Sequence, residues 1–169
     1  MFYWRITKYN PNNRDESGAY TQEEWTSSSD INKTYNHTVL TAEAYTKTEY
    51  AYVVAVLEFM KCLKVSALEI AALEKHGFQP SELMYPAPMK KLYEMIQIGS
   101  LVALEDIQWV TQLALRENIW CKLKCSKMQV HFRYDFYMYI ASIEPCIGTI
   151  QNIQSNGLFV ESITSLPWS

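Results

Sequence analysis

Side chains able to move protons are concentrated in the segment Met128–Ile140 (MQVHFRYDFYMYI). His131, Arg133 and Asp135 follow one another at every second position, and Tyr137 comes two residues later. A histidine and a carboxylate can act as general acid and base while an arginine holds a phosphate, so this spacing would fit nuclease chemistry. The chain has only 3 histidines, however, and no second proton shuttle is evident. We therefore assign no catalytic residue and expect the protein not to be an enzyme.

The four cysteines offer a second possible chemistry, metal binding. Cys121 and Cys125 fall on an alternating, strand-like segment. Residues four apart on a strand are ~13 Å apart, which is too far to share one zinc ion. The N-terminus (MFYWRITKYN) has no basic region followed by an apolar stretch, so no signal peptide is visible. We expect Cys62, Cys121, Cys125 and Cys146 to be free thiols in a cytoplasmic protein, without metal or cofactor.

The segment Met128–Ile140 also alternates between apolar and polar residues, which predicts a β-strand with two faces. Met128, Val130, Phe132, Tyr134, Phe136, Met138 and Ile140 form the face expected to cover a core. The other face carries His131, Arg133, Tyr137 and Tyr139. Tyrosine and arginine are frequent at the centres of protein interfaces, so this second face is a candidate contact surface.

Other periodic segments complete an α+β pattern. Thr41 is a plausible N-cap for a helix to about Leu63, and Glu49 falls inside its apolar stripe, where we expect it at the edge or bonded to a hydroxyl rather than catalytic. The further elements predicted are strands at 2–9, 65–74, 119–125 and 157–161, and a helix at 101–118. Residues 65–74 would also fit a continuation of the first helix. We expect one domain over 1–169, a mostly antiparallel sheet with helices packed on one face.

The turn Ser126-Lys127 predicts a hairpin between the two C-terminal alternating segments. In the simplest register Leu123 faces Val130, Lys122 faces His131 and Trp120 stacks on Arg133. A shift of two residues would preserve the faces and change these partners.

Charge and aromatic residues point to a protein partner. The net charge is -3, and residues 1–60 hold 8 acids against 5 bases, which favours a basic partner and gives nucleic-acid binding little support. A polar loop spans about 10–40, and no apolar run is long enough to cross a membrane. The predicted contact residues are Asp15, Glu16, Glu23, Glu24, Trp25, Asp30, Trp109, Trp120, Arg133, Tyr137 and Tyr139.

Four segments carry a family resemblance: FYWRITKYNP, EWTSSSDI, LRENIWCKL and VHFRYDFYMYI. Together they resemble the immunity proteins of bacterial contact-dependent growth inhibition and related polymorphic toxin systems. The resemblance implies a cytosolic inhibitor that binds a cognate toxin domain, often a basic nuclease, and it transfers no individual site residue. The alternative function is a small RNA-processing enzyme or RNA-binding protein that uses the strand face from His131 to Tyr139.

Overall fold

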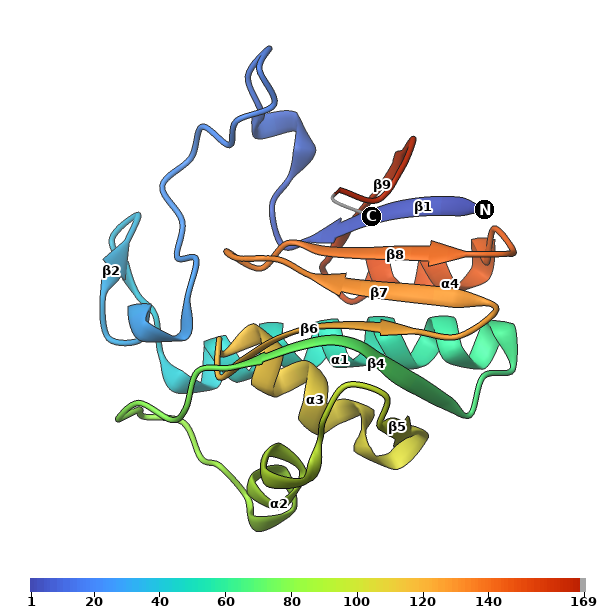
Figure 1. Ribbon diagram of the computed structural model, residues 1–169. Helices are drawn as coiled ribbons and strands as arrows, with labels where there is room; N and C mark the ends of the chain where they lie inside the picture. The colour runs from blue at the N-terminus through green and yellow to red at the C-terminus, as the bar shows by residue number, and fades with distance from the viewer. Residues whose placement is uncertain (168–169) are drawn as a thin grey trace.

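A seven-stranded antiparallel sheet with the strand order β5-β4-β6-β7-β8-β1-β9 organises the computed structural model, which describes residues 1–167 (Figure 1). Its strands are β1 (Phe2–Thr7), β4 (Ala67–Lys75), β5 (Leu101–Ala103), β6 (Ile119–Lys124), β7 (Met128–Phe132), β8 (Met138–Ser142) and β9 (Phe159–Ile163). The helices are α1 (Ala42–Leu63), α2 (Ala87–Met95), α3 (Ile107–Leu115) and α4 (Ile147–Ser155). In Figure 1, α1, α3 and α4 lie behind the sheet, and α2 packs on α3. The predicted α+β architecture is confirmed.

The core lies between the sheet and α1. The longest helix begins where predicted, because the Thr41 hydroxyl accepts a hydrogen bond from the Ala44 N–H, and it ends at Lys64 in a left-handed conformation. Tyr45, Tyr52 and Phe59 are fully buried along its inner stripe. They pack with the inward side chains of β6, β7 and β8 in one cluster. None of the helices within residues 1–167 is long and apolar enough to cross a membrane.

The single strand predicted over Met128–Ile140 is wrong. The chain forms β7, turns at residues 133–137, and returns as β8. Asp135 and Phe136 have positive φ angles of 61° and 64°, which a strand cannot contain. Phe136 nevertheless reaches the core, whereas Tyr134, assigned to the core face, is 59% exposed. Alternation alone could not reveal this turn, because Arg133 to Tyr137 continue the alternation of polar and aromatic residues of the strands on either side.

The remaining elements agree with the sequence to different degrees. Residues 65–74 form the predicted strand, as β4, and β6 pairs with β7 in the predicted register at Lys122–His131 and Leu123–Val130. The ladder ends before a Trp120–Arg133 pair. The helix predicted over 101–118 is shorter, because its first residues form β5 and a 3₁₀ turn, η3 (Leu104–Asp106). The helices α2 and α4 were not predicted from the sequence. The last strand, β9, starts two residues later than predicted.

A buried ion pair joins α1 to the end of α3. Glu49 is fully buried, and its carboxylate accepts hydrogen bonds from Arg116 Nε (2.9 Å) and Nη2 (2.8 Å) and from Gln112 Nε2 (2.9 Å). Burial lowers the pKa of Arg116, but the hydrogen bonds and charge of Glu49 outweigh it and raise that pKa overall. Glu49 does not lie at the stripe's edge, since it is fully buried, and the partner that neutralises it is a guanidinium 67 residues away in sequence.

The expectation of four free cysteines is also wrong. Cys62 near the end of α1 and Cys146 just before α4 form a disulfide, with a Cα–Cα distance of 6.2 Å across 84 residues of sequence. Cys121 and Cys125 are free, and burial raises the pKa of the Cys121 thiol to about 12. The pairing depends on a helix, α4, that the sequence analysis did not predict.

We predict that Glu49→Ala lowers the free energy of unfolding by about 3–5 kcal/mol, because it leaves the Arg116 guanidinium buried without its counter-charge. Urea unfolding measures this change. The double variant Glu49→Leu with Arg116→Met should recover most of the loss, since both charges are then absent. Equal stability of wild type and Glu49→Ala would contradict the buried pair.

Reduction of the disulfide should lower the free energy of unfolding by about 2–4 kcal/mol, because the cross-link restricts the unfolded chain over a long loop. Urea unfolding with and without dithiothreitol measures the effect, and Cys62→Ser should reproduce it without reductant. Thiol alkylation of the non-reduced protein unfolded in urea, followed by mass spectrometry, should label Cys121 and Cys125 alone. Labelling of all four cysteines in the unfolded, non-reduced protein would exclude the bond.

Candidate functional site

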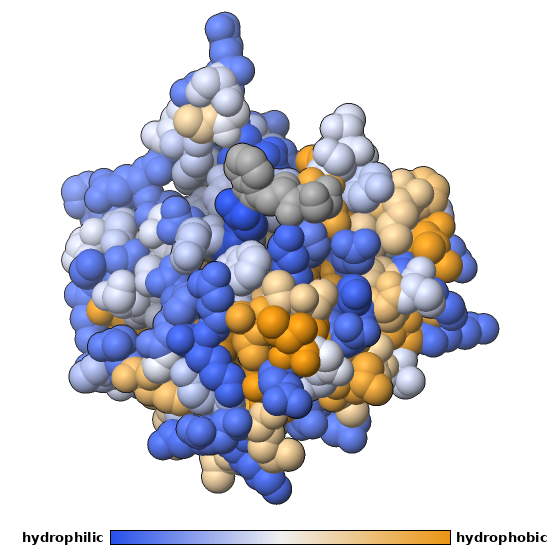
Figure 2. Space-filling view, in the orientation of Figure 1, coloured by the Kyte–Doolittle hydropathy of each residue, from blue (hydrophilic) through white to orange (hydrophobic). Residues whose placement is uncertain are grey.

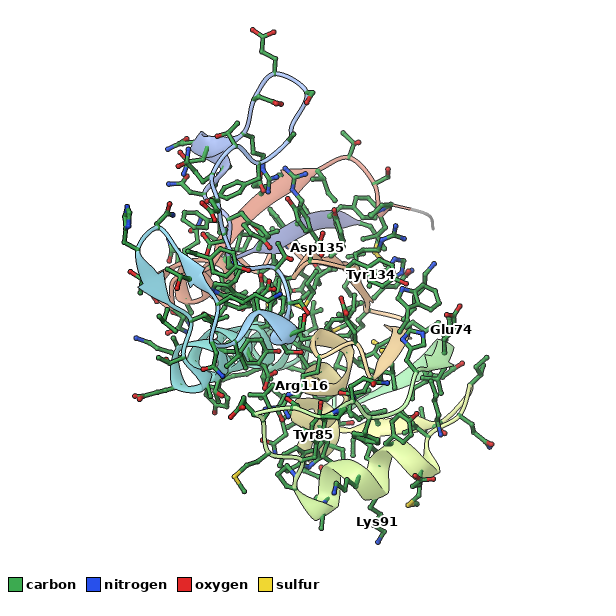
Figure 3. All side chains as sticks on the ribbon, turned by 90° about the vertical axis from the view of Figure 1, so that its left-hand side faces the viewer. Glu74, Tyr85, Lys91, Arg116, Tyr134 and Asp135 are labelled. Atoms are coloured by element: carbon green, nitrogen blue, oxygen red, sulfur yellow. A yellow bond between two sulfur atoms is a disulfide. The ribbon has the colours of Figure 1, made fainter. Side chains whose placement is uncertain are left out.

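Loops from four parts of the chain converge at one end of the sheet. They are residues 27–32, 76–82 and 116–118, together with the β7–β8 turn at 133–137; we call this surface the loop face. It occupies the left-hand side of Figure 1 and faces the viewer in Figure 3. The first three loops line a cavity of about 590 Å³. Hydrophilic side chains predominate on this side of the molecule (Figure 2).

Backbone and side-chain hydrogen bonds fix the walls of this cavity. In η2 (Ser28–Asp30) the Ser27 hydroxyl accepts from the Ser29 N–H, and Asp30 accepts from the Ser27 N–H, which is a capping box. On the opposite wall Asn118 donates to the Gly77 carbonyl (3.0 Å) and accepts from the Tyr85 hydroxyl (3.1 Å). The walls at 76–82 and 116–118 are therefore tied to each other, and the wall at 27–32 is fixed by its own hydrogen bonds.

Arg116 lies beneath the cavity, and Figure 3 shows it beside Tyr85. Its guanidinium is 4.9 Å from the centre of the Tyr85 ring and donates to the Met84 carbonyl at 2.8 Å. Because Glu49 already neutralises Arg116, the guanidinium contributes little net charge to the surface. The charge of the loop face depends on the residues around its rim.

Two exposed carboxylates, on Glu82 and Glu117, line the cavity. Two more are exposed near it: Glu74 lies beside the lining residue His76, and the charge of Asp135 acts on Glu117. None forms an ion pair with lysine or arginine among residues 1–167; His76 lies 3.5 Å from Glu74. Partial burial and the charge of Asp135 raise the pKa of Glu117. Like charges that perturb one another create a negative potential, which attracts a cationic partner.

The turn that presents Asp135 and the exposed Tyr134 is rigidly held from below. The Tyr9 hydroxyl donates to the Asp135 carbonyl and the Tyr52 hydroxyl to the Phe136 carbonyl, each at 2.7 Å. The Phe136 ring packs within 5.0–5.8 Å of the rings of Trp25, Tyr45 and Tyr52, measured between ring centres. Buried tyrosines thus support the backbone strain of two consecutive left-handed residues.

The predicted contact residues of the polar N-terminal loop differ in exposure. Asp15, Glu16 and Glu23 are exposed, as a contact role requires, and the Asp15 carboxylate also accepts hydrogen bonds from Ser17 and Ala19 in its own turn. Glu24 forms an ion pair with Lys8 at 2.9 Å, and Trp25 is only 8% exposed and packs in the core. Asp30 is buried and bonds η2 and Lys33. The last three predicted contact residues therefore hold the loop itself in place.

The predicted aromatic contacts are likewise only partly available. Tyr137 stacks on Tyr9 and accepts a hydrogen bond from Arg14 Nη1 at 2.7 Å. Tyr139 is half-buried on the outer sheet face between the neighbouring positions of β1 and β7. The other predicted contacts, Arg133, Trp120 and Trp109, are half-buried. Trp120 and Arg133 line one small crevice beside the loop face, whereas Trp109 lies on α3.

His131 does not form a proton-transfer site with its neighbours. His131 is only 4% exposed, and its imidazole donates a hydrogen bond to the carbonyl of Pro167. Burial and, to a smaller extent, the charge of Lys122 lower the pKa of His131 to about 4. The imidazole is therefore neutral at physiological pH and shielded by the chain's own C-terminal segment.

The carboxylates at and near the rim of the cavity were not predicted from the sequence. Glu74, Glu82 and Glu117 are separated in sequence, and none was assigned a contact role. A usable signal was the segment Arg116–Asn118 between two periodic elements, because a residue there often adopts a left-handed conformation; Glu117 has φ 62°. Among residues 1–167 no group of three or more His, Cys, Asp or Glu side chains could hold a metal ion.

Comparison with known proteins adds no family to this geometry. No protein-family model matches the chain, and neither does any curated protein or solved structure. The function therefore has to be argued from the loop face and its surroundings.

The buried His131 gives a pH prediction. The unfolded chain binds a proton on this imidazole near pH 6.5, whereas the folded protein binds it only near pH 4. Between pH 6.5 and about pH 4 the unfolded state therefore binds more protons than the folded state. As the pH falls through this range, His131 lowers the free energy of unfolding by on the order of 1–3 kcal/mol. Urea unfolding at pH 7, 5.5 and 4 should show a smaller loss for His131→Gln than for wild type. Parallel pH profiles would contradict the burial.

Proposed function

We propose that this protein is an inhibitor that binds another protein, neutralising a cognate bacterial toxin domain with a basic surface. The observation that carries the proposal is the loop face, where the exposed Glu82 and Glu117 line a cavity and the exposed Glu74, Tyr134 and Asp135 lie on the adjoining loops. Complementary charge accelerates association with a cationic protein, and an aromatic ring supplies area that can be desolvated on contact.

The segments that resemble immunity proteins support the same surface. EWTSSSDI supplies the Ser27–Ser29 wall, LRENIWCKL supplies Arg116–Asn118, and VHFRYDFYMYI supplies the turn with Tyr134 and Asp135. Three segments remote in sequence thus meet on the loop face (Figures 1 and 3). The burial of His131 gives no support to the alternative, an RNA-directed role of the strand face.

The inhibitor acts on its partner by covering it. The β7–β8 turn is held by two short hydrogen bonds and a buried ring, so it is positioned before the partner arrives. A preorganised surface loses little conformational entropy on binding. A basic nuclease would meet the carboxylates in place of the phosphates of its substrate.

The gene upstream of the one for this chain provides the test. We expect it to encode a large secreted protein whose C-terminal domain stops bacterial growth when expressed alone, with growth restored by coexpression of this chain. The two purified domains should form a stable complex. A C-terminal domain that neither binds this chain nor is neutralised by it would reject the proposal.

Charge-neutralising variants locate the surface. Glu74→Gln, Glu117→Gln and Asp135→Asn combined should slow association about tenfold at low salt, because steering by surface charge governs the on-rate. Stopped-flow fluorescence measures the rate. The matched control, Glu94→Gln, Glu105→Gln and Glu144→Gln, removes three exposed carboxylates outside the loop face and should leave the rate nearly unchanged. Equal rates for both triple variants would place the interface elsewhere.

A further inference from the structure

A groove adjoins the loop face on the side of α2 and α3. It measures about 430 Å³ and shares Glu82 and Arg116 with the polar cavity. Residues from α1, the 82–86 loop, α2 and α3 line it. They include Glu43, Glu82, Met84, Met89, Trp109 and Gln112. The groove is therefore continuous with the proposed contact surface while having a different composition.

Its walls are apolar and include an indole. Met89 is fully buried, Trp109 is half-buried, and Met84 at the rim is 82% exposed. An exposed methionine beside a half-buried tryptophan offers area for a long aliphatic side chain. The face of an indole also attracts cations, and it does so more strongly than the other aromatic rings.

Two carboxylates give this groove its charge. Glu43 in the first turn of α1 and Glu82 in the loop are exposed, and neither has an ion-pair partner within residues 1–167. The guanidinium of Arg116 also reaches the groove, but its charge is neutralised by the bidentate contact with Glu49. The net charge of the groove is negative, which complements a basic occupant.

Gln112 adds an acceptor that lacks a donor. Its Nε2 donates to Glu49, whereas its Oε1 is buried and accepts no hydrogen bond. A buried acceptor left without a donor costs free energy, which an incoming N–H group would recover after a small movement of the amide. The groove thus combines two carboxylates, an indole and an amide oxygen, all of which favour a cationic donor.

We propose that this groove receives an arginine side chain of the partner protein. The inference deepens the proposed function and rests on it for the source of the arginine. A guanidinium offers five N–H donors in one plane, enough for Glu43, Glu82 and Gln112 together, and it stacks on aromatic rings. The aliphatic stem would cover Met84. Lysine has three donors on a tetrahedral ammonium and no plane to stack.

The probe is the peptide acetyl-Leu-Arg-Leu-amide, with the citrulline peptide as its uncharged counterpart. Titration into the full, ¹⁵N-labelled protein should move the indole N–H signal of Trp109, which is identified by its loss in Trp109→Phe. We expect a Kd of a few mM for the arginine peptide, at least tenfold weaker binding of the citrulline peptide, and an intermediate lysine peptide.

Removing the two carboxylates tests the charge directly. Glu43→Gln with Glu82→Gln should raise the Kd of the arginine peptide about fivefold to tenfold, as expected for two partly exposed ion pairs. Both positions are exposed, so the fold should survive; an unchanged melting temperature checks this. Glu94→Gln with Glu105→Gln is the matched control and should bind like wild type.

Three results would overturn the inference: equal binding of the citrulline peptide, an unmoved Trp109 signal at about 10 mM arginine peptide, or an unchanged Kd in Glu43→Gln with Glu82→Gln. The growth test separates this failure from failure of the proposed function. If the chain protects cells but does not bind the peptide, the proposed inhibitor function stands and the arginine site is rejected. If the chain binds the peptide specifically but has no toxin partner, the arginine site stands and the arginine does not come from a toxin.

Discussion

The buried pair between Glu49 and Arg116 is the interaction on which both candidate surfaces depend. Arg116 joins α1 to the end of α3 through Glu49, holds the Met84 carbonyl and stacks on Tyr85. It thereby fixes the floor of the polar cavity and one wall of the apolar groove. A buried ion pair adds little stability relative to an apolar pair of the same volume, yet breaking it is costly. Its role here is to position the loops.

The position of Glu117 follows from that constraint. The chain must leave α3 immediately after Arg116 and enter β6 at Ile119, so two residues make the change of direction. Glu117 does so with a positive φ, and the Asn118 side chain ties the new direction to Gly77. A carboxylate is therefore held at the cavity rim by backbone geometry rather than by a partner of its own.

Local periodicity was enough to predict the helix capped by Thr41, the strand β6 and the Lys122–His131 register, because each depends on neighbouring residues. The residues of β4 fitted a strand and a continued helix alike, and only the excessive length of such a helix favoured the strand. It was not enough for features fixed by tertiary contacts. The turn at Asp135 and Phe136 exists because Tyr9 and Tyr52 bond its carbonyls from other elements. The Cys62–Cys146 bond and the partner of Glu49 likewise join segments remote in sequence. The acidic rim depends on four such loops, so no single window of sequence contained it.

The carboxylates of the loop face differ from the acids that hold the fold together. Glu24, Glu49 and Glu161 each contact a lysine or arginine, and Asp30 both caps η2 and binds Lys33. By contrast, Glu82 and Glu117 line the cavity and Asp135 acts on Glu117 through its charge, and none of the three has such a partner among residues 1–167. Clustered like charges oppose the compact state, and an external cation relieves that repulsion. A basic protein would supply this cation, so a charge that adds nothing to the stability of the fold would serve binding.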